Sequence, residues 1–455
     1  MMSRGRQGIL VALTLLSLTA RGGIAAELPQ GALPAKIDYV AKLNELVEKG
    51  SDESLNAEPF YQRAFALYVE SSTAVDAKEI ACWPTELTDE QRAALKKWVQ
   101  TNSEALTQLR LGTQKPCSWF EYKGDRVLTP DRFSYMAKAR LLLWALVLRA
   151  KSEAADGDTK DAIDDVTTAC HLAVDLRKRL LLVDQLVGLG ASAGALRAGY
   201  QILDKSRIDR SLLQRMQDQL MELSKDRSWY ISLKAEELGV LDVIQTAYGH
   251  YREEYKNKTM GWMDRIIASQ WAAQFGRDLG VNLTAEELRS ALWDHTPQEL
   301  ADLVKKGYAY YDTVVSKTPF QWKKEVIDFD EKRREFIGGN LLLSALAPAL
   351  PHVSEMSSRC RAERDALLTV LGLLRYKNDK GGLPADLEEL VSAGYIAELP
   401  MDPYSEWPLV YRRTEGNFML YSVGADFKDN GGVHSAKWGA EAPGGDFVFW
   451  PVQSQ

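Results

Sequence analysis

The stretch that decides the fold is GGLPADLEELVSAGYIAELPMDPYSEWPLVYRR at 381–413, followed by NFMLYSVGADFKDNGG at 417–432 and GDFVFW at 445–450. Glycine and proline mark its turns. Between the turns lie a short apolar helix at 387–391 and strand-like runs rich in aromatic and β-branched residues. A helix-like run precedes the first turn. We therefore predict an α+β module, in which a long helix leads to a small antiparallel sheet.

The order of these features resembles the major (G-type) pseudopilin of type II secretion systems. The resemblance implies a long helix, a turn, a small sheet and a calcium loop. In that family an apolar, filament-forming helix begins the processed chain, whereas here the module lies at the opposite end. The positions that carry the resemblance are 374–377 (LRYK), 383–384 (LP), 387–390 (LEEL), 399–400 (LP), 402–404 (DPY), Tyr411 and 421–426 (YSVGAD).

The end of the module contains an acidic loop that suits a calcium ion. Calcium takes six to eight oxygen ligands in flexible geometry, and short clusters of aspartate, asparagine and glycine supply them. The resemblance implies the same ion at this loop, so we expect a metal site formed by Asp426, Asp429, Asn430 and Asp446. The alternative is a plain turn without metal, since the same residue types favour turns. Calcium would stabilise the loop, and the sequence offers no catalytic residues beside it.

The first residues, 1–25, have the pattern of a secretory signal peptide. Arg4 and Arg6 precede an apolar core at 9–18, which ends in small residues at 23–26. The core is too short to span a bilayer comfortably, so cleavage is favoured over an uncleaved anchor. We expect export to the periplasm or the extracellular space, with no membrane span after cleavage.

The charge of the chain bears on its partners. Removal of Arg4, Arg6 and Arg21 with the signal changes the formal net charge from −7 to −10. An acidic surface disfavours nucleic acid, whose phosphates bind basic faces. We therefore expect protein partners. The sequence specifies neither their identity nor the oligomeric state of the chain.

The region 26–340 is predicted to be an all-α scaffold domain, and 341–455 the pseudopilin-like α+β domain. Residues 37–336 have helical rather than strand periodicity. The Asp156-Gly157-Asp158 turn breaks one helix from the next, whose inward face carries small residues at 162, 166, 169 and 173. This hairpin is weakly similar to a tetratricopeptide repeat. A helical array would offer a concave binding surface, whereas a closed bundle would use its faces for its own core.

The motif Gly190-Ala191-Ser192-Ala193-Gly194 fits the G-x-S-x-G pattern of a serine hydrolase. A nucleophile elbow needs a strand before the serine and a helix after it, and the surrounding pattern is helical throughout. We therefore expect a non-enzymatic interaction protein. A secreted serine hydrolase using Ser192 is one alternative, and a component of a type II secretion machinery is another.

The four cysteines, Cys82, Cys117, Cys170 and Cys360, permit three pairings in an oxidising compartment. Cys82 and Cys117 lie in turn-like segments around one helix, so a bridge would staple that hairpin. Cys170 and Cys360 lie in helical patterns, where a buried free thiol is an equally good interpretation.

Overall fold

The structure is a computed structural model that describes residues 37–70, 81–128, 134–225, 229–248, 295–346, 350–441 and 443–453. Within these ranges the chain is mainly helical, with one three-stranded antiparallel sheet close to its C-terminal end. The predicted fold class, a helical region followed by a long helix and a small antiparallel sheet, is confirmed. The predicted signal segment at 1–25 lies outside the described residues.

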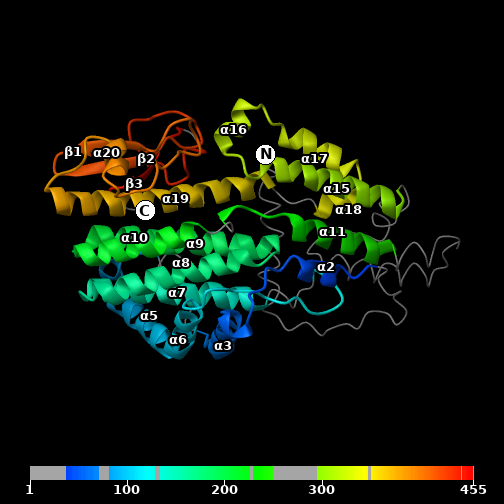
Figure 1. Cartoon of the computed structure of the whole chain (residues 1–455), viewed down its shortest axis with the longest axis horizontal. Coiled ribbons are helices and arrows are strands. Elements are labelled where there is room, and N and C mark those ends of the chain that lie inside the picture. Colours follow the sequence, from blue (N-terminus) through cyan, green and yellow to red (C-terminus); the bar gives the residue numbers. More distant parts are fainter. Residues whose placement is uncertain are drawn as a thin grey trace.

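The first part of the helical region stacks in successive layers (Figure 1). Helices α3 and α6 pack together, α7 packs on α8, and α8 packs on α9. The elements of this part are α2 (Tyr39–Glu45), α3 (Glu58–Leu67), α5 (Asp89–Thr101), α6 (Ser103–Gly112), α7 (Ser134–Ala155), α8 (Thr159–Lys178), α9 (Leu182–Lys205), α10 (Arg210–Ser224) and α11 (Lys234–Ala247), with the 3₁₀ turns Glu53–Leu55 and Pro84–Glu86.

The predicted break between two of these helices is confirmed. Helix α7 ends at Ala155 and α8 begins at Thr159. Gly157 takes a left-handed φ of 93°, which glycine adopts without steric cost. The Asp158 side chain then caps α8 by accepting a hydrogen bond from the Asp161 amide. Local chemistry therefore sets this boundary.

Helix α8 is the centre of the helical region. It packs against α7, α9 and α10, and most of its residues are buried on all sides. Its predicted inward stripe, Ala162, Val166, Ala169 and Ala173, is fully buried. Small side chains on this stripe let the neighbouring helices approach closely.

A second group of helices follows the first and leads to the C-terminal module. Helix α15 (Pro297–Val314) packs against α11 and α17. Its start is fixed by a capping box, in which Thr296 and Glu299 exchange side-chain and backbone hydrogen bonds. The other members of the group are α16 (Pro319–Lys324), α17 (Phe329–Ile337) and α18 (Leu341–Leu346).

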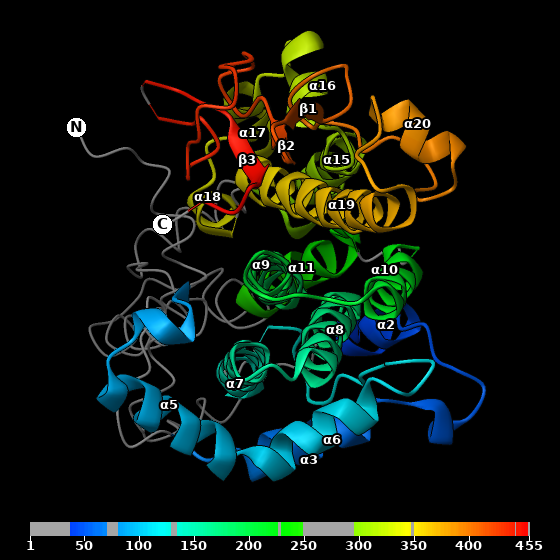
Figure 2. The ribbon, with the colours of Figure 1, turned by 90° about the vertical axis from the view of Figure 1, so that its left-hand side faces the viewer.

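Helix α19 (Leu350–Lys380) joins the module to the scaffold. One side packs against α9 and α10, and another side packs against α20 (Leu387–Ser392) and the sheet. The end-on view shows α19 between the sheet and α9 (Figure 2). Among the described residues, no helix combines the length and the apolar character that a membrane crossing requires.

The sheet has the order β1-β2-β3 and both pairs of neighbours are antiparallel. Strand β1 (Val410–Thr414) and β2 (Asn417–Ser422) form a hairpin, and β3 (Phe447–Trp450) pairs with the other edge of β2. The core is a single hydrophobic cluster that includes both the scaffold and the module. The module is therefore anchored on the scaffold rather than tethered to it.

Candidate functional site

Asp402 connects the turn at 402–404 to the end of β2, after which the acidic loop begins. Its side chain is 2% exposed, and Oδ1 accepts hydrogen bonds from the Tyr404 amide at 2.9 Å and the Ser422 hydroxyl at 2.7 Å. Its Oδ2 accepts from the Val423 amide at 2.8 Å. The carboxylate thus connects the turn at 402–404 to the end of β2. The sequence marked this aspartate as a turn residue and gave no sign of this second role.

Three of the four predicted calcium ligands lie together in the loop. Asn430 donates from Nδ2 to Asp426 Oδ2 at 2.9 Å, and its backbone amide donates to Asp446 Oδ1 at 3.1 Å. The Gly432 amide donates to Asp446 Oδ2 at 2.6 Å, and the Gly445 amide to Asp426 Oδ2 at 3.2 Å. The two ends of the loop are therefore held together by carboxylates that accept N–H groups.

The fourth predicted ligand, Asp429, faces other partners. Its Oδ2 accepts from Arg412 Nη2 at 2.8 Å, and its Oδ1 accepts from the Tyr421 hydroxyl and the Gly431 amide, both at 2.8 Å. Asp429 therefore shares no hydrogen bond with the other three residues, and the charge of Arg412 on β1 pairs with its carboxylate.

Burial and hydrogen bonding act in opposite directions on the loop carboxyls. Burial raises the pKa of Asp446, and the charges of Asp429 and Asp426 raise it further, against the hydrogen bonds from Asn430 and Gly432. For Asp426, hydrogen bonds from Asn430, Lys428 and Gly445 outweigh burial and lower the pKa. The charge of both carboxylates is therefore balanced by N–H groups of the loop itself.

Two glycines allow the beginning and the end of this loop to lie in close contact. Gly444 has a φ of 90°, and a Cβ there would lie 2.3 Å from Asp426 Oδ2. Gly424 has a φ of 75°, and its Cβ would lie 2.7 Å from the Trp438 carbonyl oxygen. A side chain at either position would push the two ends of the loop apart.

The donor set of the loop suits calcium in chemistry. Two carboxylates and one amide oxygen are hard ligands of the kind that calcium prefers. Asn430 presents its NH₂ group to Asp426, so its oxygen would have to turn inward to bind an ion. Within the described part of the chain, no group of three or more His, Cys, Asp or Glu side chains is arranged to hold a metal.

An open groove of about 750 Å³ adjoins this loop. Ala425 and Phe427, on either side of Asp426, form part of its lining, and the module also contributes Tyr404. The scaffold side is formed by α16 and the start of α17, and the first turns of α19 close the groove between scaffold and module (Figure 1). The lining residues on these three helices and the segments between them are Pro319, Trp322, Lys323, Val326, Ile327, Asp328, Phe329, Asp330, Pro351 and Glu355.

Direct contacts hold the two sides of the groove in place. The Phe320 amide donates to the Pro403 carbonyl oxygen at 3.0 Å, and Lys324 forms an ion pair with Glu406. Lys323 Nζ lies 4.1 Å from the centre of the Phe427 ring. The groove is therefore a junction between scaffold and module that the fold itself maintains.

Deeper in the groove, aromatic and charged side chains are engaged with one another. The Tyr404 hydroxyl donates to Glu355 Oε1 at 2.8 Å and accepts from Arg359 Nε at 2.6 Å. The Trp322 and Phe329 rings meet edge to face with centroids 5.1 Å apart. These contacts keep the aromatic lining preorganised.

Ser192 lies in the middle of α9 and not at a strand-to-helix turn. It is 1% exposed, and its Oγ accepts a hydrogen bond from Arg177 Nη1 at 2.9 Å. The geometry of a nucleophile elbow is therefore missing around this serine. A Cβ at Gly188 would lie 2.8 Å from the Ala173 carbonyl oxygen, so this glycine lets α9 pack closely on α8.

The structure shows all four cysteines as free thiols. The proposed Cys82–Cys117 bridge is not formed. Cys117 pairs with Asn56 ahead of α3, whereas the carbonyl of Cys82 accepts a hydrogen bond from Lys151, on α7, at 3.3 Å. The chain around each cysteine is thus held by different neighbours.

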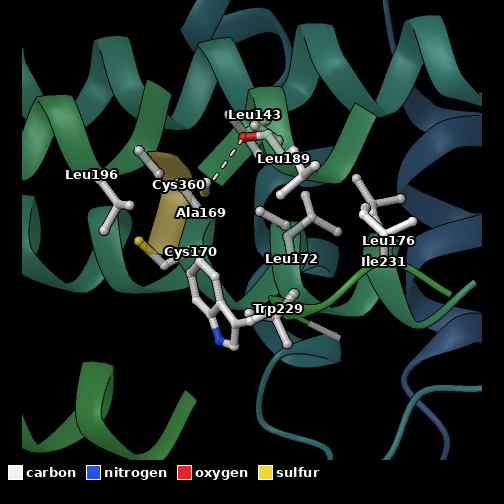
Figure 3. Close-up of a cluster of buried hydrophobic side chains, with 14 of the residues drawn as sticks. Leu143, Ala169, Cys170, Leu172, Leu176, Leu189, Leu196, Trp229, Ile231 and Cys360 are labelled. Atoms are coloured by element: carbon white, nitrogen blue, oxygen red, sulfur yellow. Dashed lines mark hydrogen bonds between the residues drawn. The ribbon is translucent and has the colours of Figure 1, made fainter. Parts of the chain in front are cut away.

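Cys170 and Cys360 are buried between α8, α9 and α19, among leucine side chains and Trp229 (Figure 3). The Cys360 thiol lies 3.9 Å from the Leu189 carbonyl oxygen. Burial raises the pKa of Cys170 to about 12 and that of Cys360 to about 11. Both remain protonated and pack as small apolar groups, which is the buried free thiol of the two interpretations from the sequence.

A buried ionic network was missed by the sequence reading. Arg179, directly after α8, is 5% exposed and donates from Nη2 to both carboxylate oxygens of Glu58, at 2.7 and 2.8 Å. Its guanidinium lies 4.1 Å from the centre of the Tyr135 ring, and Tyr135 donates to Asp184. Helical periodicity cannot reveal such a network, since it shows which face is buried and not which partner meets it.

No protein-family model matches the chain, and no curated protein or solved structure is similar enough to count as a match.

Proposed function

We propose that this is an exported, non-enzymatic protein that acts through contacts with other proteins in the periplasm or outside the cell. The helical region serves as the scaffold. The C-terminal module, similar to a type II secretion pseudopilin, presents the binding surface, and calcium stabilises its loop. The observation that carries this proposal is the open, aromatic-lined groove where module and scaffold meet.

Exposed apolar side chains beside the groove support a binding role. Val326 is 85% exposed and Trp407 is 72% exposed. Trp407 follows Glu406, which is paired with Lys324, so it lies beside the scaffold side of the junction. Tryptophan at a surface is a frequent anchor of protein interfaces, because it buries a large area with little loss of conformational freedom.

Calcium enters the proposal as a stabilising ion. Asp426, Asn430 and Asp446 would hold it, and the ion would hold the two ends of the loop together. Phe427, which lines the groove, lies next to Asp426, so a firm loop would keep this ring in place. Binding of the ion to the folded chain alone would add to stability.

Photo-cross-linking in cells tests the role. A photoreactive phenylalanine analogue replaces Trp407 in one strain and Leu111, 39% exposed on α6, in a control strain. We expect a defined protein adduct in the extracytoplasmic fraction from position 407 and none from position 111. A chain that stays in the cytoplasm, or equal adducts from both positions, contradicts the proposal.

The identity of the cross-linked protein also decides a second candidate, a component of a type II secretion machinery. The pseudopilin-like order of the module favours this candidate. Adducts with subunits of a secretion apparatus would support it, whereas adducts with other proteins would restrict the resemblance to the fold of the module.

A further inference from the structure

Val326, on the rim of the groove, has a left-handed backbone conformation although its side chain is not packed against the fold. Helix α16 ends with the Ile327 amide donating to the Trp322 carbonyl at 3.1 Å and the Val326 amide donating to the Lys323 carbonyl at 3.3 Å. This pair of bonds is a Schellman motif, and it places Val326 at the left-handed position that glycine usually occupies. Its φ is 53°.

A β-branched residue is strained in this conformation, because its Cβ crowds the following carbonyl oxygen. Burial of the side chain does not offset the strain, since Val326 is 85% exposed. Strain of this kind is concentrated at functional positions. Phe427, on the opposite side of the groove, also has a left-handed φ, of 60°. Both sides of the groove therefore present an apolar side chain from a strained backbone.

The charges of the lining indicate the chemistry of the partner. It contains three carboxylates, those of Asp328, Asp330 and Glu355, and one cation, Lys323. Lys323 lies over the Phe427 ring, and Glu355 is held by Tyr404 and Arg359. Asp328 and Asp330, at the exposed start of α17, flank Phe329 in sequence, and Asp328 also caps the helix by accepting a hydrogen bond from the Glu331 amide at 2.8 Å. The rim thus combines negative charge with an aromatic surface.

We propose that this groove binds a segment of a partner protein in which lysine or arginine stands next to a large apolar side chain. The apolar side chain packs against Val326 and the aromatic lining. The cation lies between the carboxylates of Asp328 and Asp330 and over an aromatic ring, an arrangement that attracts ammonium and guanidinium groups. This inference rests on the proposed role in protein binding and adds the surface and the partner's chemistry.

A selection of random dodecapeptides displayed on phage tests the proposal with the full exported chain as bait. We expect enrichment of peptides that pair lysine or arginine with leucine, phenylalanine or tryptophan. A synthetic peptide of the enriched sequence then gives dissociation constants by fluorescence polarisation. No enrichment, or enrichment of acidic or uncharged peptides, overturns the proposal.

Three variants locate the binding. Asp330→Lys should weaken the peptide about fivefold to tenfold, because it places a positive charge against the peptide's cation. Glu388→Lys, the same change on the exposed face of α20, should leave the affinity unchanged. Val326→Gly should weaken binding about fivefold while it relieves strain, so that loss of folding cannot explain the result. Equal affinities for Asp330→Lys and Glu388→Lys overturn the proposal.

A second copy of this chain is the other occupant to be distinguished. If a second copy filled the groove, light scattering would show a concentration-dependent mass that Phe329→Asp abolishes, and this outcome also overturns the proposal. If no peptide binds but the cross-link from position 407 persists, the proposed function stands and the partner binds a surface other than the groove. Loss of the cross-link and of export would instead refute the proposed function itself.

Discussion

The scaffold and the C-terminal module bury their charged groups in opposite ways. In the scaffold, a charged side chain meets a side chain from far away in the sequence: Arg179 meets Glu58 from 121 residues away, and Tyr61 meets Asp175 from 114 away. In the module, Asp446 and Asp426 accept backbone amides from within 20 residues. The scaffold therefore depends on its long-range packing, and the module depends on the conformation of one loop.

The comparison predicts that the largest loss of stability will come from the scaffold network. Arg179→Met should reduce the free energy of unfolding by about 3–5 kcal/mol, because it leaves the buried Glu58 carboxylate without its partner. Urea denaturation followed by circular dichroism measures the change. The double variant Arg179→Met/Glu58→Met should recover much of the loss, and a double variant as unstable as the single one would contradict the ion pair's role.

A smaller loss is expected in the module. Asp446→Ala leaves the Asn430 and Gly432 amides without their acceptor. Both amides are part-buried, so each should cost about 1 kcal/mol, the lower end for an unsatisfied donor. Proteolysis of the folded chain should then cut within 424–446 at an increased rate. Glu441→Ala is the matched control in the same segment, since its ion pair with Lys437 is about two-thirds exposed and should contribute little. Equal cleavage in the two variants would contradict the closing role of Asp446.

The scaffold should also respond to pH. Burial raises the pKa of Glu236 to about 7, helped by the charge of Asp184, and burial raises the pKa of Asp184 itself to about 6. Both carboxyls bind a proton more tightly in the folded chain than in the unfolded chain. Their contribution to stability is thus complete below about pH 4 and is lost as the pH rises through 6 to 7.

We therefore expect the free energy of unfolding to fall by about 2–4 kcal/mol between pH 5 and pH 8. Glu236→Gln should flatten this dependence, because the amide stays neutral over the whole range. Denaturation series at both pH values measure the two slopes, and an unchanged slope in the variant would mean that other groups cause it.

The smallest expected effect is a gain in stability from a change at the groove, where the scaffold and the module meet. Val326→Gly should stabilise the fold by about 1 kcal/mol, since glycine accepts the left-handed φ without strain. Thermal unfolding measures the shift, with Val433→Gly, another largely exposed valine, as control. A loss of stability in Val326→Gly would show that this side chain supports folding and would remove the argument from strain.

The contrast between the regions also explains what the sequence could predict. Short-range signals were sufficient for the turn at 156–158 and the helix at 387–391, whereas the two aspartates and the asparagine of the loop were expected from the resemblance. The pairing of Asp429 with Arg412 had no sequence signal, because Arg412 lies on β1, 17 residues away. Ser192 matched a motif whose context, a helix on both sides, argued against it.

The groove and the buried network had no usable sequence signal. Glycine is the residue that marks a left-handed helix end, so valine at 326 gave no indication of one. Glu58, Arg179 and Asp184 look like ordinary surface residues of amphipathic helices until the packing brings them together. Both features depend on long-range contacts, which residue spacing does not encode.

The most direct test of the account is thermal unfolding of the exported chain in the presence of calcium or of a calcium chelator, for the natural sequence and for Asp426→Ala and Asp446→Ala. We expect a higher melting temperature with calcium in the natural chain and no such difference in either variant. Identical melting of the natural chain with calcium and with chelator would contradict a calcium-stabilised module.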